Sequence, residues 1–176
     1  MPFRTKYEIY ATQKIAPVYS GYDKTMAFVE MEDRIRNPKG DCYRMVQTVE
    51  PVGELTKSEE YLLLVFNVRK LITKYYTQGR DHDVMKESLK YESLLDKWNQ
   101  RTQVFIDSHP GYKPADKKSH AFYVLVSEWR NVFKERNAYL KRKMGFDWNV
   151  FNEMEKKKKS LEKQIDKYIK EQFQLL

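Results

Sequence analysis

The pattern of apolar positions predicts that the last two thirds of the chain are helical. From residue 57 onward, large apolar side chains recur every three or four residues, which is the period of an α-helix. Single glycines and prolines interrupt this pattern and mark helix ends, because glycine costs backbone entropy and proline lacks an amide donor. We therefore expect a helical bundle over residues 54–176, with helices at about residues 57–78, 82–107, 116–143 and 148–175.

The helix at about residues 57–78 is expected to form the core of this bundle. Its start carries Thr56-Lys57-Ser58-Glu59, a capping box in which the threonine hydroxyl accepts from the first turn and the glutamate reaches back. Apolar side chains from Leu62 to Tyr76 then cover more than one stripe of the helix. That breadth is typical of a helix buried on several sides.

The last two helices are long for a domain of this size. Each has room for about 30 residues, or roughly 45 Å at 1.5 Å per residue, so we expect one end of the pair to extend beyond the bundle. In the final helix the positions 151, 154, 158, 161, 165 and 168 alternate in steps of three and four, like the seam of a coiled coil. Lys158 occupies one slot of that seam.

The N-terminal third has a less regular pattern. One helix is expected at about residues 23–36, with Asp23 as its N-cap. Residues 7–10 fit a short strand, an arm or a turn of helix, and residues 42–49 fit an extended segment. We therefore predict an arm or irregular segment over residues 1–53, with one helix and room for a short strand.

Composition is consistent with one folded domain, or one domain and an arm. The chain has 176 residues, of which 41% are hydrophobic and 14% aromatic, so it has enough apolar surface to build a core. Taken with the helical pattern, this predicts an all-α fold class: a bundle of four to five helices, with long C-terminal helices and a less regular N-terminal third.

Cysteine content and the lack of long apolar runs suggest where the protein works. Cys42 is the one cysteine, so no disulfide can form within the chain. The first ten residues include Arg4 and Lys6 and do not resemble a signal peptide. The longest apolar run is far shorter than the ~20 residues of a membrane span. We expect a protein that is cytoplasmic or part of an assembled particle and is not secreted by a signal peptide.

The net charge of +8 is concentrated in the last third of the chain. Residues 1–111 carry 17 basic and 16 acidic side chains, a net of +1, whereas residues 112–176 carry 16 and 9, a net of +7. Positive charge at one end attracts anionic partners such as nucleic acid, an acidic protein surface or an anionic lipid, and it does not select among them.

The sequence contains no recognisable catalytic constellation. No two glycines lie within ten residues of each other, which excludes the glycine-rich phosphate-binding loops in their usual form. We therefore predict no catalytic residues, no cofactor and no metal. If the protein were an enzyme with an unrecognised helical site, Glu30, Asp33 and His82 would be the first residues to test.

A basic and aromatic patch around Gly145 is the most informative chemical feature. Cations beside flat rings can bind phosphates and stack on bases. The same lysines also fit a simpler role, because cations in a last turn favour the helix dipole and Glu153 and Glu155 are placed to pair with Lys157 and Lys159 at i,i+4. The predicted patch for an anionic partner comprises Lys141, Arg142, Lys143, Trp148, Lys156, Lys157, Lys158 and Lys159.

These observations favour a non-enzymatic structural or assembly protein. Such a protein would dock on other protein subunits through its helices and its N-terminal arm; a virus or phage particle component fits this description, as does a cellular adaptor, and an oligomer is plausible. The main alternative is a nucleic-acid-binding protein that uses the patch around Gly145. An enzyme is the weaker alternative.

Overall fold

The chain divides into two compact units. The computed structural model describes residues 3–12, 14, 16–36, 41–77, 79–142 and 145–173. One unit, here called the sheet unit, comprises Met1–Thr56 with Lys170–Leu176. The other, the helical unit, comprises Lys57–Ile169. Whether either unit folds as an independent domain stays a prediction.

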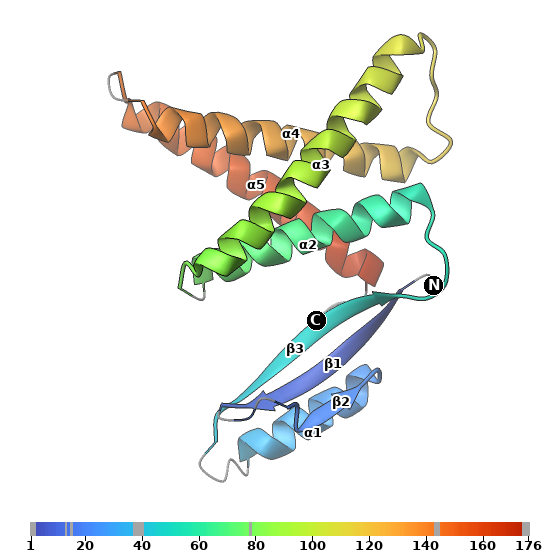
Figure 1. Cartoon of the computed structure of the whole chain (residues 1–176), viewed down its shortest axis with the longest axis vertical. Coiled ribbons are helices and arrows are strands. Elements are labelled where there is room, and N and C mark those ends of the chain that lie inside the picture. Colours follow the sequence, from blue (N-terminus) through green and yellow to red (C-terminus); the bar gives the residue numbers. More distant parts are fainter. Residues whose placement is uncertain are drawn as a thin grey trace. The chain divides into compact units, whose positions relative to one another are not determined.

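The sheet unit contains three antiparallel strands and one helix. Strands β1 (Phe3–Ala11), β2 (Tyr19–Gly21) and β3 (Tyr43–Pro51) form a sheet of order β2-β1-β3, and α1 (Lys24–Arg36) lies along it (Figure 1). The helix starts as expected, because the Asp23 carboxylate accepts a hydrogen bond from the Met26 amide at 2.9 Å. β1 and β3 pair over nine residues, from Phe3 opposite Pro51 to Ala11 opposite Tyr43.

Side chains alternate across β1 as a half-buried strand requires. Tyr7, Ile9 and Ala11 are buried on one face. On the same face, the Phe3 ring meets the Phe173 ring edge-on with centroids 4.8 Å apart, and the Thr5 hydroxyl donates to the Phe173 carbonyl at 3.0 Å. The last turn of the final helix is therefore part of the sheet unit.

The mostly helical fold is confirmed, but the N-terminal third is more regular than predicted. The described residues include five helices together with the three-stranded sheet. The all-α prediction left out this sheet, because β1 and β3 stabilise each other across about 40 residues of sequence and neither is convincing when read alone.

The helical unit contains two helical hairpins. α2 (Lys57–Thr77) turns through Gly79, with φ +104°, into α3 (His82–Ser108), and α4 (Lys117–Leu140) turns through Gly145, with φ +72°, into α5 (Trp148–Phe173). A positive φ is easily adopted only by glycine. α3 crosses α4, and the end of the α4–α5 hairpin that contains the turn extends away from α2 and α3 (Figure 1). No helix among the described residues is long and apolar enough to cross a membrane.

The core of the helical unit combines aliphatic side chains with a central tryptophan. Of the seven largest fully buried side chains among the described residues, six belong to the helical unit: Val65, Val68, Leu95, Val126, Trp129 and Ile165. The buried Tyr61 hydroxyl donates to the Asn99 side chain at 2.7 Å, and burial raises the pKa of Tyr61 far above its ordinary range. A buried phenol that keeps a hydrogen bond avoids most of the cost of desolvation.

Two arginines flank the Trp129 ring, with guanidinium carbons 5.3 Å (Arg69) and 5.5 Å (Arg130) from its centroid. Arg69 binds Asp166 through two hydrogen bonds of 2.9 and 2.8 Å and binds Glu162 at 2.9 Å. These three residues join α2 to α5. We call Trp129, the two arginines and their carboxylates the Trp129 cluster.

Arg130 repeats this arrangement between α3 and α4. Its guanidinium binds Asp96 at 3.0 and 3.2 Å and Glu92 at 2.9 Å, and only 5% of its side chain is exposed. Burial opposes the charge, but the hydrogen bonds and charges of Asp96 and Glu92 raise the pKa of Arg130 above its ordinary value. Each arginine is therefore a charged, fully partnered link between two helices.

Candidate docking site at the turn between α4 and α5

The turn between α4 and α5 is fixed by one tyrosine. The Tyr139 hydroxyl accepts a hydrogen bond from the Asp147 amide at 2.8 Å and donates to the Asp147 carbonyl at 3.4 Å. The Asp147 carboxylate in turn accepts from the Asn149 amide at 2.7 Å, which caps the start of α5. The end of one helix thus holds the beginning of the next.

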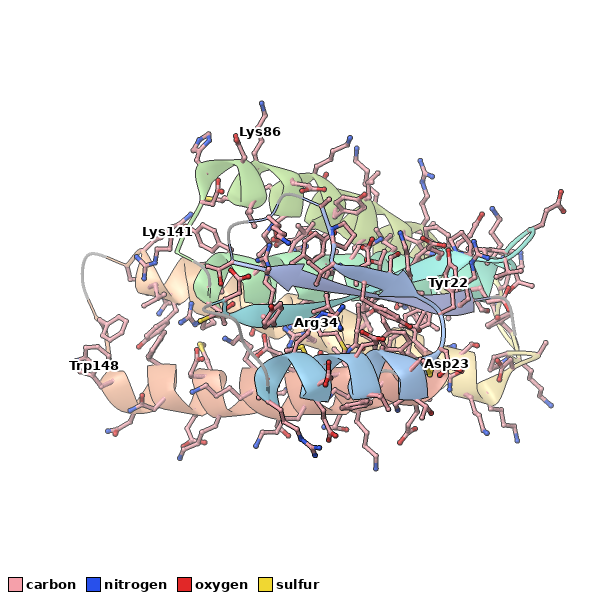
Figure 2. All side chains as sticks on the ribbon, turned by 90° about the horizontal axis from the view of Figure 1, so that it is seen from below. Tyr22, Asp23, Arg34, Lys86, Lys141 and Trp148 are labelled. Carbon is pink, nitrogen blue, oxygen red and sulfur yellow. The ribbon has the colours of Figure 1, made fainter. Side chains whose placement is uncertain are left out.

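Four aromatic rings gather at this turn, and we call them the tip cluster: Tyr139, Phe146, Trp148 and Phe151. Phe146 is central, with centroids 5.2 Å from Tyr139, 4.9 Å from Trp148 and 5.7 Å from Phe151. These spacings are typical of edge-to-face and tilted aromatic pairs. Tyr139 is buried, whereas Trp148 is 68% exposed and projects from the first turn of α5 (Figure 2).

Cations border the tip cluster. The Arg142 guanidinium lies 4.6 Å from the Tyr139 ring centroid, and that of Arg136 lies 5.1 Å from the Phe151 centroid. Lys141, at the end of α4, is exposed at the same end of the molecule as Trp148 (Figure 2). Neither Lys141 nor Arg142 has an ion-pair partner among the residues that the structure describes.

The four consecutive lysines of α5 do not form one exposed surface. Lys156 pairs with Glu153 at 2.8 Å, within α5, and Lys157 pairs with Glu128 of α4 at 2.8 Å. Lys158 is only 14% exposed and pairs with Glu155 at 3.0 Å. Of the four, Lys159 alone is exposed without an ion pair to a described residue.

The Lys158 slot of the predicted seam is therefore semi-buried but charged. Burial alone would raise the pKa of Glu155, yet the hydrogen bonds and charges of Lys158 and Arg136 hold it below its usual range. The buried side of α5 also departs from the alternating seam, because it follows the fourth-residue spacing of Leu161, Ile165, Ile169 and Phe173. Tyr168, a predicted seam position, is half-buried.

Of the predicted patch, Lys141 and Trp148 lie at the same end of the molecule (Figure 2), and Arg142 contacts the Tyr139 ring of the tip cluster. The lysines from 156 onward begin eight residues further along α5, which is about 12 Å at 1.5 Å per residue. Lys143 lies outside the described residues. The anionic-partner patch as a whole stays a prediction, and its compact part is the tip.

Sequence reasoning missed the Trp129 cluster and did not single out two exposed apolar residues near the turn. These are Leu140, the last residue of α4, and Val150, in the first turn of α5. The adjacency of Trp129 and Arg130 in the sequence was a signal for the cluster. The acids that complete it come from distant segments, so only the fold could identify them.

The residues named for the enzyme alternative belong to different units. Glu30 pairs with Arg34 on α1, in the sheet unit. His82 is exposed at the start of α3, in the helical unit. Within the described part of the chain, no group of three or more histidine, cysteine or carboxylate side chains is arranged to hold a metal ion.

Comparison with known proteins gives no relative for this chain: no family model, no curated protein and no solved structure matches it.

Proposed function

We propose that this protein is a non-enzymatic structural or assembly protein that docks on another protein subunit through the tip cluster. The observation that carries the proposal is the 68% exposed Trp148, which packs against the Phe146 and Phe151 rings in a cluster bordered by Lys141 and Arg142. Tryptophan, tyrosine and arginine are the residues that dominate the binding energy of protein interfaces.

The tip is built in a way that suits an interface. Its rings are fixed by mutual contacts and by the Tyr139 hydrogen bonds, so little side-chain freedom remains to be lost on binding. The complementary partner surface is an apolar pocket for the indole with acidic residues at its rim.

Nucleic-acid binding is the second candidate, because Trp148 beside Lys141 and Arg142 also suits a stacked base between phosphates. It has less support, since three of the four α5 lysines are engaged by carboxylates. It predicts binding of a single-stranded oligonucleotide that weakens steeply with salt and is lost when Lys141 and Arg142 become glutamine.

The test compares wild type with Trp148→Ser and with Val104→Ser, whose residue is equally exposed but lies on α3. Tagged protein from its native cells is analysed for subunits that co-purify in fixed stoichiometry, and complex mass is measured by light scattering. We expect Trp148→Ser to weaken the complex roughly 30-fold, corresponding to about 2 kcal/mol, and Val104→Ser to leave it unchanged. A strict monomer without a partner, or equal binding by both variants, would contradict the proposal.

A further inference from the structure

The sheet unit has a long strand at its edge. In the described sheet of order β2-β1-β3, β3 lies on the side of β1 opposite to β2 (Figure 1). β2 has three residues, whereas β3 has nine and follows β1 in an unbroken one-to-one register. The outer side of an edge strand presents a row of backbone donors and acceptors to any strand that can pair with it. We call the outer side of β3 the β3 edge.

The hydrogen bonds between β1 and β3 determine which backbone groups face this edge. The Thr12 amide donates to the Cys42 carbonyl at 2.9 Å, one position beyond the pair of Ala11 with Tyr43. Bonded and non-bonded pairs alternate along an antiparallel ladder. The even-numbered positions of β3 therefore bond to β1, and the odd-numbered positions direct their backbone N–H and C=O groups to the β3 edge.

The sequence of β3 has few of the features that prevent an edge strand from pairing. Natural edge strands are often very short, or they carry lysines, a proline within the strand or a bulge. β3 contains no lysine, and its one proline, Pro51, is its last residue. Its two charged residues, Arg44 and Glu50, have opposite signs and lie near opposite ends. This sequence favours pairing with a strand whose charges run in the complementary order.

β3 is complementary to itself in one antiparallel register. When Gln47 is placed opposite its own copy, Arg44 lies opposite Glu50 at both ends, and Met45 lies opposite Val49. Arg44 and Glu50 are on the same face of β3, and in this register they form the pairs without backbone hydrogen bonds, in which opposite side chains come closest. A shift of two residues, the smallest that keeps odd-numbered positions opposite one another, separates the two charges.

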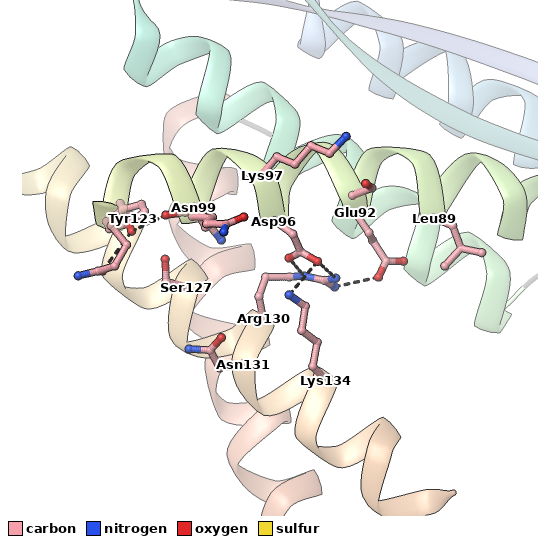
Figure 3. A pocket seen from close by; sticks show the side chains of 13 residues that line it. Leu89, Glu92, Asp96, Lys97, Asn99, Tyr123, Ser127, Arg130, Asn131 and Lys134 are labelled. Carbon is pink, nitrogen blue, oxygen red and sulfur yellow. Dashed lines mark hydrogen bonds and ion pairs between the residues drawn. The ribbon is translucent and has the colours of Figure 1, made fainter. Parts of the chain in front are cut away.

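Arg44 is available for such a pair. Its side chain is exposed, and its guanidinium carbon lies 5.5 Å from the Tyr10 ring centroid. It has no ion pair with any residue that the structure describes. Arg130 in the helical unit is the opposite case, because Glu92 and Asp96 already surround its guanidinium (Figure 3).

Glu50 can accept a second arginine. It binds the Arg4 side chain at 3.2 Å and the Tyr22 hydroxyl at 3.0 Å, and both donors use the same oxygen, Oε2. The other carboxylate oxygen, Oε1, has room for a further donor. The carboxylate is thus held in place on β3 by Arg4 and Tyr22 and can still meet an arginine from another strand.

We propose that β3 pairs with β3 of a second copy of this chain, antiparallel and with a two-fold axis at Gln47. The symmetry doubles each contact, so the interface contains two pairs of Arg44 with Glu50 and two pairs of Met45 with Val49. The three strands of each copy then join into one sheet of order β2-β1-β3-β3-β1-β2. Backbone hydrogen bonds hold the copies together, and the charge pairs set the register. The proposal is independent of the tip cluster.

Charge substitutions in the full chain test the register. Sedimentation velocity over a range of concentrations should show a dimer for the wild type. Arg44→Glu places acids opposite each other and Glu50→Lys places bases opposite each other, so each variant should weaken its homodimer about tenfold. An equimolar mixture of the two variants brings opposite charges together again. It should form a 1:1 heterodimer, which a tag on one variant identifies by mass.

A backbone substitution tests the pairing of the strands themselves. Met45→Pro removes an N–H that faces the β3 edge and no hydrogen bond to β1, so it should convert the dimer to monomer. Met45→Val keeps the N–H and, like Trp148→Ser in the tip cluster, should leave the dimer intact. Circular dichroism confirms that each variant is folded. A wild type that stays monomeric at every concentration, a dimer that both Arg44→Glu and Met45→Pro leave intact, or a mixture without heterodimer would overturn the proposal.

Discussion

Trp129 and Trp148 both belong to clusters of rings and cations, but the two clusters differ in burial and in the supply of carboxylates. Around the buried Trp129, Arg69 and Arg130 each bind two acids. Around Trp148, Lys141 and Arg142 have no acid among the described residues, and the indole is largely in solvent. The same residue types therefore build an interior in one place and a surface in the other.

The supply of carboxylates separates cations that hold the fold together from cations that are available to a partner. A buried guanidinium is tolerated only when acids and hydrogen bonds replace the water it has lost. Arg142 is itself exposed beside the buried Tyr139 ring, so its guanidinium keeps its water and can meet an acidic partner. Composition alone cannot make this distinction, because the distinction depends on which acidic side chains the fold places next to each cation.

The largest expected effect comes from removing one interior arginine. Arg130→Ala leaves Glu92 without its guanidinium partner and Asp96 with Lys134 alone, and should lower the free energy of unfolding by about 3–5 kcal/mol. Arg142→Ala, its counterpart at the tip, should change it by less than about 0.5 kcal/mol. Urea denaturation measures both. Equal effects of the two substitutions would remove the distinction between the clusters.

A smaller effect is expected from Asp96. Because its pKa is lowered in the folded protein, Asp96 contributes stability that is present above its unfolded pKa of about 3.9 and is lost as the pH falls through the folded pKa. Asp96→Asn should cost about 1–3 kcal/mol at pH 7 and flatten the loss of stability below about pH 4. Denaturation midpoints measured from pH 7 to pH 2 check this. An unchanged acid profile in the variant would show that Asp96 does not couple folding to protons.

The smallest expected effect concerns the surface lysines of α5. Lys157 pairs with Glu128 across the α4–α5 hairpin, and both side chains are about half exposed. Lys157→Ala should therefore lower the free energy of unfolding by less than about 1 kcal/mol, and added salt should reduce the difference further. If Lys157→Ala lowered the free energy of unfolding as much as Arg130→Ala, exposed ion pairs would stabilise the fold as strongly as buried ones.

Some helix starts are marked by local side-chain caps. Asp81 and Asp116 accept hydrogen bonds from backbone amides two residues later, at 2.8 and 2.9 Å, and open α3 and α4. These caps act within one turn of helix, so the local sequence is enough to recognise them. The pairing of β1 with β3 could not be predicted in this way, because each strand depends on a partner far along the chain.

The candidate site was only partly predictable for a similar reason. Gly145 placed Lys141 and Arg142 near Trp148, since a bend between two helices brings their ends together. Whether the side chains of Lys157 and Lys158 are exposed or paired depends on how α5 is rotated about its axis. Glu128 of α4 comes within reach of Lys157 only in that rotation, and Lys158 points inward to Glu155.

The most direct test uses the photo-crosslinking residue benzoylphenylalanine at position 148, in cells that produce the protein. The control carries the same residue at exposed position 160 of α5. We expect one discrete adduct from position 148, mapped by mass spectrometry to an acid-rimmed apolar surface of a single partner subunit, and none from position 160. No adduct, or the same adducts from both positions, would contradict the claim that the tip cluster is a docking surface.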